Sequence, residues 1–349
     1  MPAEPLYLDH AATTPLLPTA RDAWLGGMAI WANPSSPHRQ GRAARAALED
    51  ARARIKSALG WEGEVVFTSG ASEALALAVG RSKQRLAAVS PIEHEAVLRH
   101  AAGIARLSVD SAGRVDAASA GRSGLVAVQQ VNSETGVVQP LAEIAVAVRE
   151  SGGILLADCA QGAGKLALPD ADLIALAAHK FGGPVGIGAL LVRDWALLEP
   201  SGGQERGYRA GTENLPGIMA MASALEAGSE WMTEAARLRE RLEKGIIAAG
   251  GEVVASEAER SPTIGGYRMP GTSSAAQLIR FDAMGIAVSA GSACSSGSLR
   301  SSHVLSAMGM DEKAASEVIR ISIGRETTEA DIARFLDAWQ AVAGKRVAA

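Results

Sequence analysis

Short apolar runs that end in glycine, proline or charged residues recur along the first 200 residues and predict buried strands. These runs lie at 64–67, 86–89, 106–109, 125–131, 154–157, 173–178 and 186–192. Continuous apolar runs of this length are typical of parallel strands that are covered on both faces. Stretches with helical periodicity separate them, at 41–59, 71–79 and 141–150. The alternation predicts an α/β fold with a doubly wound, parallel sheet.

The pattern changes after residue 200. A Gly-rich polar loop at 201–214 precedes two helical stretches, 216–232 and 233–248, and short strands and helices follow. Loops of that length without periodicity are usually functional. We therefore expect three parts: an extended arm (1–20) that packs with the small domain, a large domain (21–248) and a small C-terminal α+β domain (249–349).

Composition and charge narrow the classes of function. The chain is 48% hydrophobic with a net charge of -4, which argues against a nucleic-acid-binding surface. No apolar run reaches the 18 residues that suggest a membrane span, and no signal peptide is recognisable, so we expect a cytoplasmic protein. Two cysteines and six histidines without CxxC or HExxH spacing favour no metal site.

Two of the predicted strands end in residues with complementary chemistry. The run 154–157 is followed by Asp158, and the run 173–178 by His179 and Lys180. Ligands bind at the carboxyl ends of parallel strands, so both side chains should enter one cleft. Pyridoxal phosphate needs this pair, a lysine for its Schiff base and a carboxylate for its ring nitrogen. The alternative is an ion pair at the surface.

Three further features each allow two interpretations. Ser69 to Ser72 precede a predicted helix, where they form either a phosphate site or a serine N-cap. His94 stacks on an aromatic ring or faces solvent at a helix start. Arg320, within the predicted strand 318–323, is either a clamp for a carboxylate or a member of a half-buried salt bridge.

The two cysteines lie in contrasting surroundings. Cys294 stands in a Ser/Gly-rich segment, 288–298, where a thiol should be exposed and reactive. Cys159 follows a buried strand, and burial as a small apolar residue is the common fate of such a cysteine. A disulfide between them is improbable in a reducing compartment.

Ten ordered motifs together make the chain resemble the cysteine desulfurases of the class V aminotransferase superfamily. They are YLDHAATTP (7–15), NPSSPH (33–38), FTSGASEA (67–74), EHEAVL (93–98), VNSETGVVQP (131–140), DCAQ (158–161), HK (179–180), ERGYRAGT (205–212), SAGSACSSGS (289–298) and IRISIGRETT (319–328). The resemblance implies fold type I, with a mostly parallel seven-stranded sheet between helices in the large, pyridoxal-phosphate-binding domain.

The resemblance also implies a role for each matching residue. Catalysis falls to Lys180, which carries the cofactor and shuttles a proton, to Cys294, which takes the substrate sulfur as a persulfide, and to His94, which stacks on the ring. Asn33 and Arg320 would bind the substrate carboxylate. The cofactor-binding residues would be Lys180, Asp158, Gln161, His94, Gly70, Ala71, Ser72, Ser133, His179 and, from the neighbouring subunit of a homodimer, Thr212.

The implied reaction converts L-cysteine to L-alanine and leaves sulfur on Cys294. That sulfur would pass to a protein acceptor for iron–sulfur cluster or thio-cofactor assembly, with no nucleic acid, membrane or metal involved.

The sequence departs from the family pattern at several places. Ser133 replaces an Asn that contacts the ring, Ala177 replaces a Ser that contacts the phosphate, and Cys159 and Ala160 replace Ala and Thr. Residues 256–272 match poorly, and a C-terminal docking extension is expected to be missing. Two alternatives therefore stay open: another class V pyridoxal-phosphate transaminase or lyase, and a non-catalytic paralogue that binds a sulfur-assembly partner.

Overall fold

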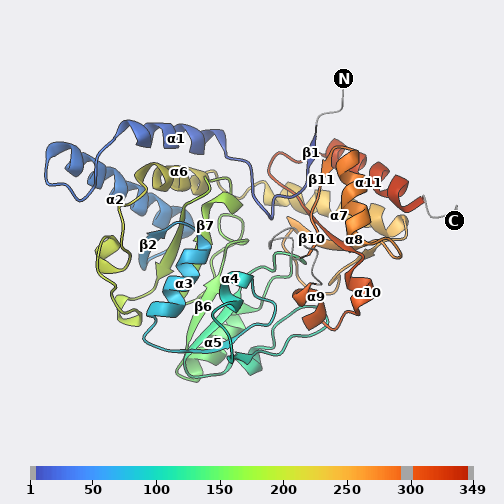
Figure 1. Ribbon diagram of the computed structural model, residues 1–349, viewed down its shortest axis with the longest axis horizontal. Helices are drawn as coiled ribbons and strands as arrows, with labels where there is room; N and C mark the ends of the chain where they lie inside the picture. Colours follow the sequence, from blue (N-terminus) through green and yellow to red (C-terminus); the bar gives the residue numbers. More distant parts are fainter. Residues whose placement is uncertain (1–4, 292–301, 345–349) are drawn as a thin grey trace.

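The computed structural model describes residues 5–291 and 302–344 (Figure 1). Its centre is a seven-stranded sheet with the order β2-β8-β7-β6-β5-β3-β4. The strands are β2 (Glu64–Thr68), β3 (Leu86–Val89), β4 (Ala105–Arg106), β5 (Leu125–Gln129), β6 (Ile154–Asp158), β7 (Leu173–Ala177) and β8 (Gly188–Val192). β8 is antiparallel to both of its neighbours, and the pairs from β7 to β4 are parallel. The expected mostly parallel α/β sheet is thus confirmed.

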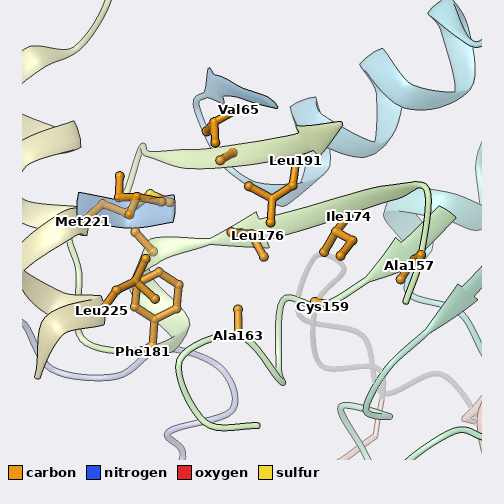
Figure 2. Packing of buried hydrophobic residues seen from close by; sticks show 14 of the residues in the cluster. Val65, Ala157, Cys159, Ala163, Ile174, Leu176, Phe181, Leu191, Met221 and Leu225 are labelled. Carbon is orange, nitrogen blue, oxygen red and sulfur yellow. The ribbon is translucent and has the colours of Figure 1, made fainter. Parts of the chain in front are cut away.

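Helices cover both faces of this sheet because consecutive apolar residues of its strands point to opposite sides. On one face Leu155 and Leu191 pack with α2 (Arg39–Leu59), α5 (Leu141–Glu150) and α6 (Leu215–Glu226). Figure 2 shows part of this core. On the other face Leu156 and Leu190 pack with α3 (Ala71–Arg81) and α4 (Glu95–Leu98). α1 (Pro18–Ala29) lies outside, along α6 (Figure 1).

A second core gathers the C-terminal elements around three neighbouring aromatic rings, in which Phe281 stacks with both Phe335 and Trp339. Its helices are α7 (Met232–Ala248), α8 (Ser274–Ala283) and α11 (Glu329–Gly344), with the short α9 (His303–Ala307) and α10 (Glu312–Ala315) beside it. Its three-stranded sheet has the order β12-β10-β9, with β9 (Glu252–Val253), β10 (Ile264–Arg268) and β12 (Val318–Ser322).

The N-terminal segment joins the second core. β1 (Leu6–Tyr7) pairs in parallel with β11 (Ile286–Ala287), and the Leu6 and Leu8 side chains are buried in that core. Residues 9–14 then run toward the large sheet, and α1 begins at Pro18, whose ring suits the first turn of a helix.

Two expected elements differ from the structure. The strand expected at 106–109 ends at Arg106, because Asp110 and Gly113 close a turn that pairs Val109 with Val115. The helix expected at 216–232 ends at Glu226, since Gly228 adopts a φ of 74°. Among the helices in the described ranges, none is both long and apolar enough to cross a membrane.

Candidate active site

A cavity of about 510 Å³ opens at the carboxyl ends of β5, β6 and β7, beside β12. The parallel strands deliver their terminal polar residues to this edge, as the sequence predicts. The cavity is lined by ten of the predicted site residues: Gly70, Ala71, Ser72, His94, Ser133, Asp158, Gln161, His179, Lys180 and Arg320. The amine and the carboxylate that were predicted to share a cleft therefore do so.

Lys180 follows β7 and is held by the N-terminal segment. Its Nζ donates hydrogen bonds to the carbonyl oxygens of Ala11 (2.7 Å) and Ala12 (2.9 Å). Thr14 Oγ1 donates to the Lys180 carbonyl, 3.2 Å away. Sequence reasoning missed Ala11 and Ala12 because they contribute backbone oxygens, which no side-chain pattern reveals.

Asp158 is the last residue of β6, and its buried side chain borders the cavity. Its Oδ1 accepts a hydrogen bond of 2.9 Å from the Ala160 N–H group. Burial raises the pKa of the Asp158 carboxyl, while the Ala160 N–H, His94 and Lys180 oppose the rise by favouring the charged form. A cationic ring nitrogen beside this carboxylate would add to the same effect.

A second carboxyl, Glu93, lies fully buried near Asp158 and was not predicted. Its Oε1 accepts a 2.7 Å hydrogen bond from the N–H of Gln129, which pairs in register with Asp158. Burial raises the pKa of Glu93 well above its ordinary value, and the negative charge of Asp158 adds to the rise. Both effects favour the neutral form of Glu93.

The start of α3, where an anion site was predicted, borders the cavity. Its N-cap residue is Gly70, and no side chain of the described residues caps it, so the serine-cap interpretation is wrong. The first N–H groups of the helix and its dipole remain available to a phosphate. β8 passes close to the start of α3. A Cβ added to Gly188 of β8 would clash with the Leu176 carbonyl oxygen and would lie 2.7 Å from Gly70 Cα.

Gln161 offers a polar atom to a ligand. Its Nε2 donates to the Ala11 carbonyl (2.8 Å), while its buried Oε1 has no hydrogen-bond partner among the described residues. Together with Lys180, Asp158 and the uncapped α3, this amide fits pyridoxal phosphate: an amine for the aldehyde, a carboxylate for the ring nitrogen and N–H groups for the phosphate.

Two histidines border the same cavity. His94 caps α4, its Nδ1 accepting a 3.1 Å hydrogen bond from the Ala96 N–H, and it is half-buried rather than facing solvent. His179 Nδ1 lies 3.2 Å from Thr13 Oγ1. Burial lowers the pKa of His179 to about 4, and the cations of Lys180 and Lys165 add to this, so the imidazole is neutral at pH 7.

Arg320 forms the salt bridge that the sequence allowed, and it also borders the cavity. Its Nη2 forms a 2.7 Å salt bridge with Asp9, and its Nη1 donates to the Ser133 carbonyl (3.0 Å). The guanidinium also lines the cavity, and its buried Nε has no hydrogen-bond partner within residues 5–291 and 302–344. An arginine with such a group is suited to a substrate carboxylate.

The remaining predicted residues lie elsewhere. Asn33 is exposed outside the cavity, where its Oδ1 accepts a 2.8 Å hydrogen bond from the Ser35 N–H, and Thr212 is also exposed. Cys294 lies outside the described residues. Cys159 is fully buried, and burial raises the pKa of its thiol well above the ordinary value, so it is not the reactive cysteine. Ala177 contributes a methyl group to the cavity wall.

The fold and this residue set define a class V aminotransferase: the family model for aminotransferase class-V matches residues 6–335. A cysteine desulfurase of Cereibacter sphaeroides is 37% identical over 96% of this chain and 94% of its own length. The chain belongs to the cysteine desulfurase family within that class.

Solved structures agree with this assignment. A NifS-like protein from Rickettsia africae superposes with a TM-score of 0.88 at 30% identity, covering 97% of this chain and 99% of its own. A second structure, SspA in complex with cysteine, gives a TM-score of 0.79 at 29% identity over 93% of this chain and all of its own. The α/β fold and the family are therefore shown by independent likenesses.

Proposed function

We propose that the chain is a pyridoxal-phosphate-dependent cysteine desulfurase that converts L-cysteine to L-alanine and holds the sulfur as a persulfide on Cys294. The observation that carries the proposal is the shared cavity of Lys180, Asp158 and the uncapped N-terminus of α3. A structural paralogue without catalysis would have no need to keep these three features together.

Lys180 would hold the cofactor and then move the proton at the substrate Cα. When bound, pyridoxal phosphate supplies an electron sink for the carbon that loses this proton. Asp158 would keep the ring nitrogen protonated, and Gln161 would hydrogen-bond the ring oxygen. Gly70, Ala71, Ser72 and His179 would orient the phosphate.

Arg320 would orient the substrate by its carboxylate, with His94 over the reacting centre and Ser133 beside it. The Cys294 thiolate would then attack the substrate sulfur. An S–S bond forms as the Cβ–S bond breaks, the electron pair goes to Cβ, and protonation there completes alanine. Cysteine and the enzyme thiol thus become alanine and an enzyme persulfide without an added oxidant or reductant.

Release of sulfide and alanine tests the reaction directly. The purified protein, given L-cysteine and a reductant, should produce both in equal amounts. Cys294→Ser should abolish sulfide release and keep the yellow colour of the bound cofactor. A colourless protein would favour the non-catalytic paralogue, and a spectral response to other amino acids but not to cysteine would favour another class V enzyme.

We further propose a homodimer, in which Thr212 serves the partner's cavity. The support is an exposed apolar strip along α1 and just beyond its end, with Leu25 and Met28 each 59% exposed and Trp31 91% exposed. Monomers rarely expose such a cluster. Sedimentation should give about twice the chain mass of 35.9 kDa, and Trp31→Arg should shift it toward the monomer.

The persulfide would pass to a protein acceptor of iron–sulfur or thio-cofactor assembly in the cytoplasm. We also propose a large domain, 21–248, and a small domain, 249–349, with the arm 1–20 packed on the latter. The two hydrophobic cores support this division, except that α7 packs in the second core and that Leu17 and Ala20 pack in the first. Asn33 as a substrate ligand stays a prediction, since it lies outside its own chain's cavity.

A further inference from the structure

The residues on either side of the segment that carries Cys294 lie close to the carboxylate of Glu134. Gly291 precedes this segment and Ser302 follows it. The Ser302 Oγ donates a hydrogen bond of 2.6 Å to Glu134 Oε2. A Cβ on Gly291 would lie 3.6 Å from the same Glu134 oxygen and 3.5 Å from Ser302 Cβ. Glu134 thus contacts Ser302 and lies close to Gly291, although both are more than 150 residues away in sequence.

Glu134 belongs to a turn that is held by hydrogen bonds of its own. Asn132, 1% exposed, accepts three hydrogen bonds at its Oδ1, from the N–H groups of Glu134 and Thr135 (both 2.9 Å) and from Thr135 Oγ1 (3.1 Å). Glu134 and Ser302 are themselves 8% and 5% exposed. The buried hydrogen bond from Ser302 to Glu134 therefore restricts the position of the chain directly after the segment.

The same turn contacts the predicted substrate ligand. The Ser133 carbonyl accepts from Arg320 Nη1, and the backbone of Arg320 pairs with Ser289 through bonds of 2.6 Å and 3.2 Å. The chain therefore pairs with Arg320 shortly before the segment, at Ser289, and contacts Glu134 directly after it, at Ser302. Glu134, Gly291 and Arg320 also border one small cavity of about 10 Å³.

We propose that Glu134 is a positioning residue that fixes both bases of the cysteine-bearing segment relative to Arg320, and so sets how often the Cys294 thiol reaches the substrate sulfur. The inference rests on the proposed function for the identity of the thiol. It predicts that loss of the Glu134 contact slows sulfur transfer while substrate binding at Arg320 and cofactor binding persist.

The test compares Glu134→Ala, Glu134→Gln and Ser302→Ala holoenzymes in single turnovers with cysteine. Glu134→Ala and Ser302→Ala should slow persulfide formation, followed by mass spectrometry, about 10- to 100-fold, the size expected for an ångström-scale misplacement. Glu134→Gln keeps an acceptor oxygen and should recover most of the rate. The cysteine concentration that half-saturates the change in cofactor absorbance should stay within twofold of the parent.

Asp311→Ala is the matched control. Ser302 also caps α9, and Asp311 caps the neighbouring α10 in the same way, accepting a 2.9 Å hydrogen bond from the Ala314 N–H. Among the described residues, Asp311 forms no hydrogen bond with Glu134, so its loss should leave the single-turnover rate unchanged. An equal slowing in Asp311→Ala would show that the loss of a cap, and not the Glu134 contact, explains the effect.

A second readout does not involve the reaction. A nitroxide attached to Cys294 should tumble faster in Glu134→Ala than in the parent, and Glu134→Gln should restore the parental spectrum. Parental rates and parental label motion in Glu134→Ala would overturn the inference. If Cys294→Ser still releases sulfide, the proposed function fails instead, and the label motion continues to test the contact.

Discussion

The buried ion pair between Arg52 and Glu205 anchors the 201–214 loop, and truncating its carboxylate should destabilise the protein. Arg52 Nη1 and Nη2 each donate a 3.0 Å hydrogen bond to Glu205, whose Oε2 also accepts a 2.9 Å bond from the Phe67 N–H. The two side chains are 6% and 1% exposed. Glu205 even adopts a φ of 48° to make these contacts.

The magnitude follows from what Glu205→Ala leaves behind. The Arg52 guanidinium would stay buried with the Val65 carbonyl and the partly exposed Glu49, and the Phe67 N–H would lose its acceptor. Breaking a buried pair by removing one partner costs about 3–5 kcal/mol when the remaining charge is left uncompensated, and the half-exposed Glu49 compensates the Arg52 charge only in part. We expect a loss in this range, together with loosening of the loop that carries Thr212.

Glu226→Ala is the control, because it removes the partner of Arg54, which lies two residues after Arg52 on α2. Arg54 and Glu226 are joined by shorter hydrogen bonds of 2.6 Å and 2.7 Å, but they are 36% and 40% exposed. Exposed pairs contribute about 0–1 kcal/mol. Urea unfolding of both variants measures the two losses. If Glu205→Ala and Glu226→Ala lose the same free energy of unfolding, the reasoning is refuted, because burial would then not decide how much an ion pair contributes to stability.

Three further predictions concern the cavity. Burial and Lys180 lower the pKa of Lys165 from 10.5 to about 7, so the unfolded state binds more protons between those values and the free energy of unfolding should rise with pH there. In cofactor-free protein Lys165→Met should remove this slope and stabilise by about 4 kcal/mol at pH 7, at about 1.4 kcal/mol per pKa unit; unchanged pH-dependent melting would contradict it. Gly188→Ala should abolish cofactor retention, because its Cβ would clash with the Leu176 carbonyl and Gly70; a yellow, stable variant would disprove that close approach. Arg320→Lys should raise KM for cysteine about tenfold by losing a bidentate hydrogen bond worth about 1.5 kcal/mol or more; steady-state kinetics with a parental KM would exclude Arg320 as the carboxylate ligand.

The sequence predicted the strands of the large sheet well because their signal is local. Runs such as 154–157 and 173–178 are apolar throughout, and they end in residues that proved to share one cavity. Topology rules then place Asp158 and Lys180 at the same edge without knowledge of any contact. Element ends were predicted less well where a single residue decides them, as Gly228 does after α6.

The contacts that sequence reasoning missed are non-local or made by the backbone. The Ala11 and Ala12 carbonyls hold Lys180 across nearly 170 positions, and Asp9 pairs with Arg320 across more than 300. Glu93 lies beside the noted His94, but its burial next to Asp158 depends on how β3 and β6 flank β5. Such pairings require the folded chain, since no spacing along the sequence encodes them.

Reductive trapping tests the central claim, that Lys180 and Asp158 hold one pyridoxal ring. The purified holoprotein is reduced with borohydride, which fixes the cofactor on its lysine, and its peptides are mapped by mass spectrometry. We predict a pyridoxyl group on Lys180, and a weakened, blue- or red-shifted chromophore in Asp158→Asn. A label on Lys165 or on any other lysine, or no label at all, would contradict the account.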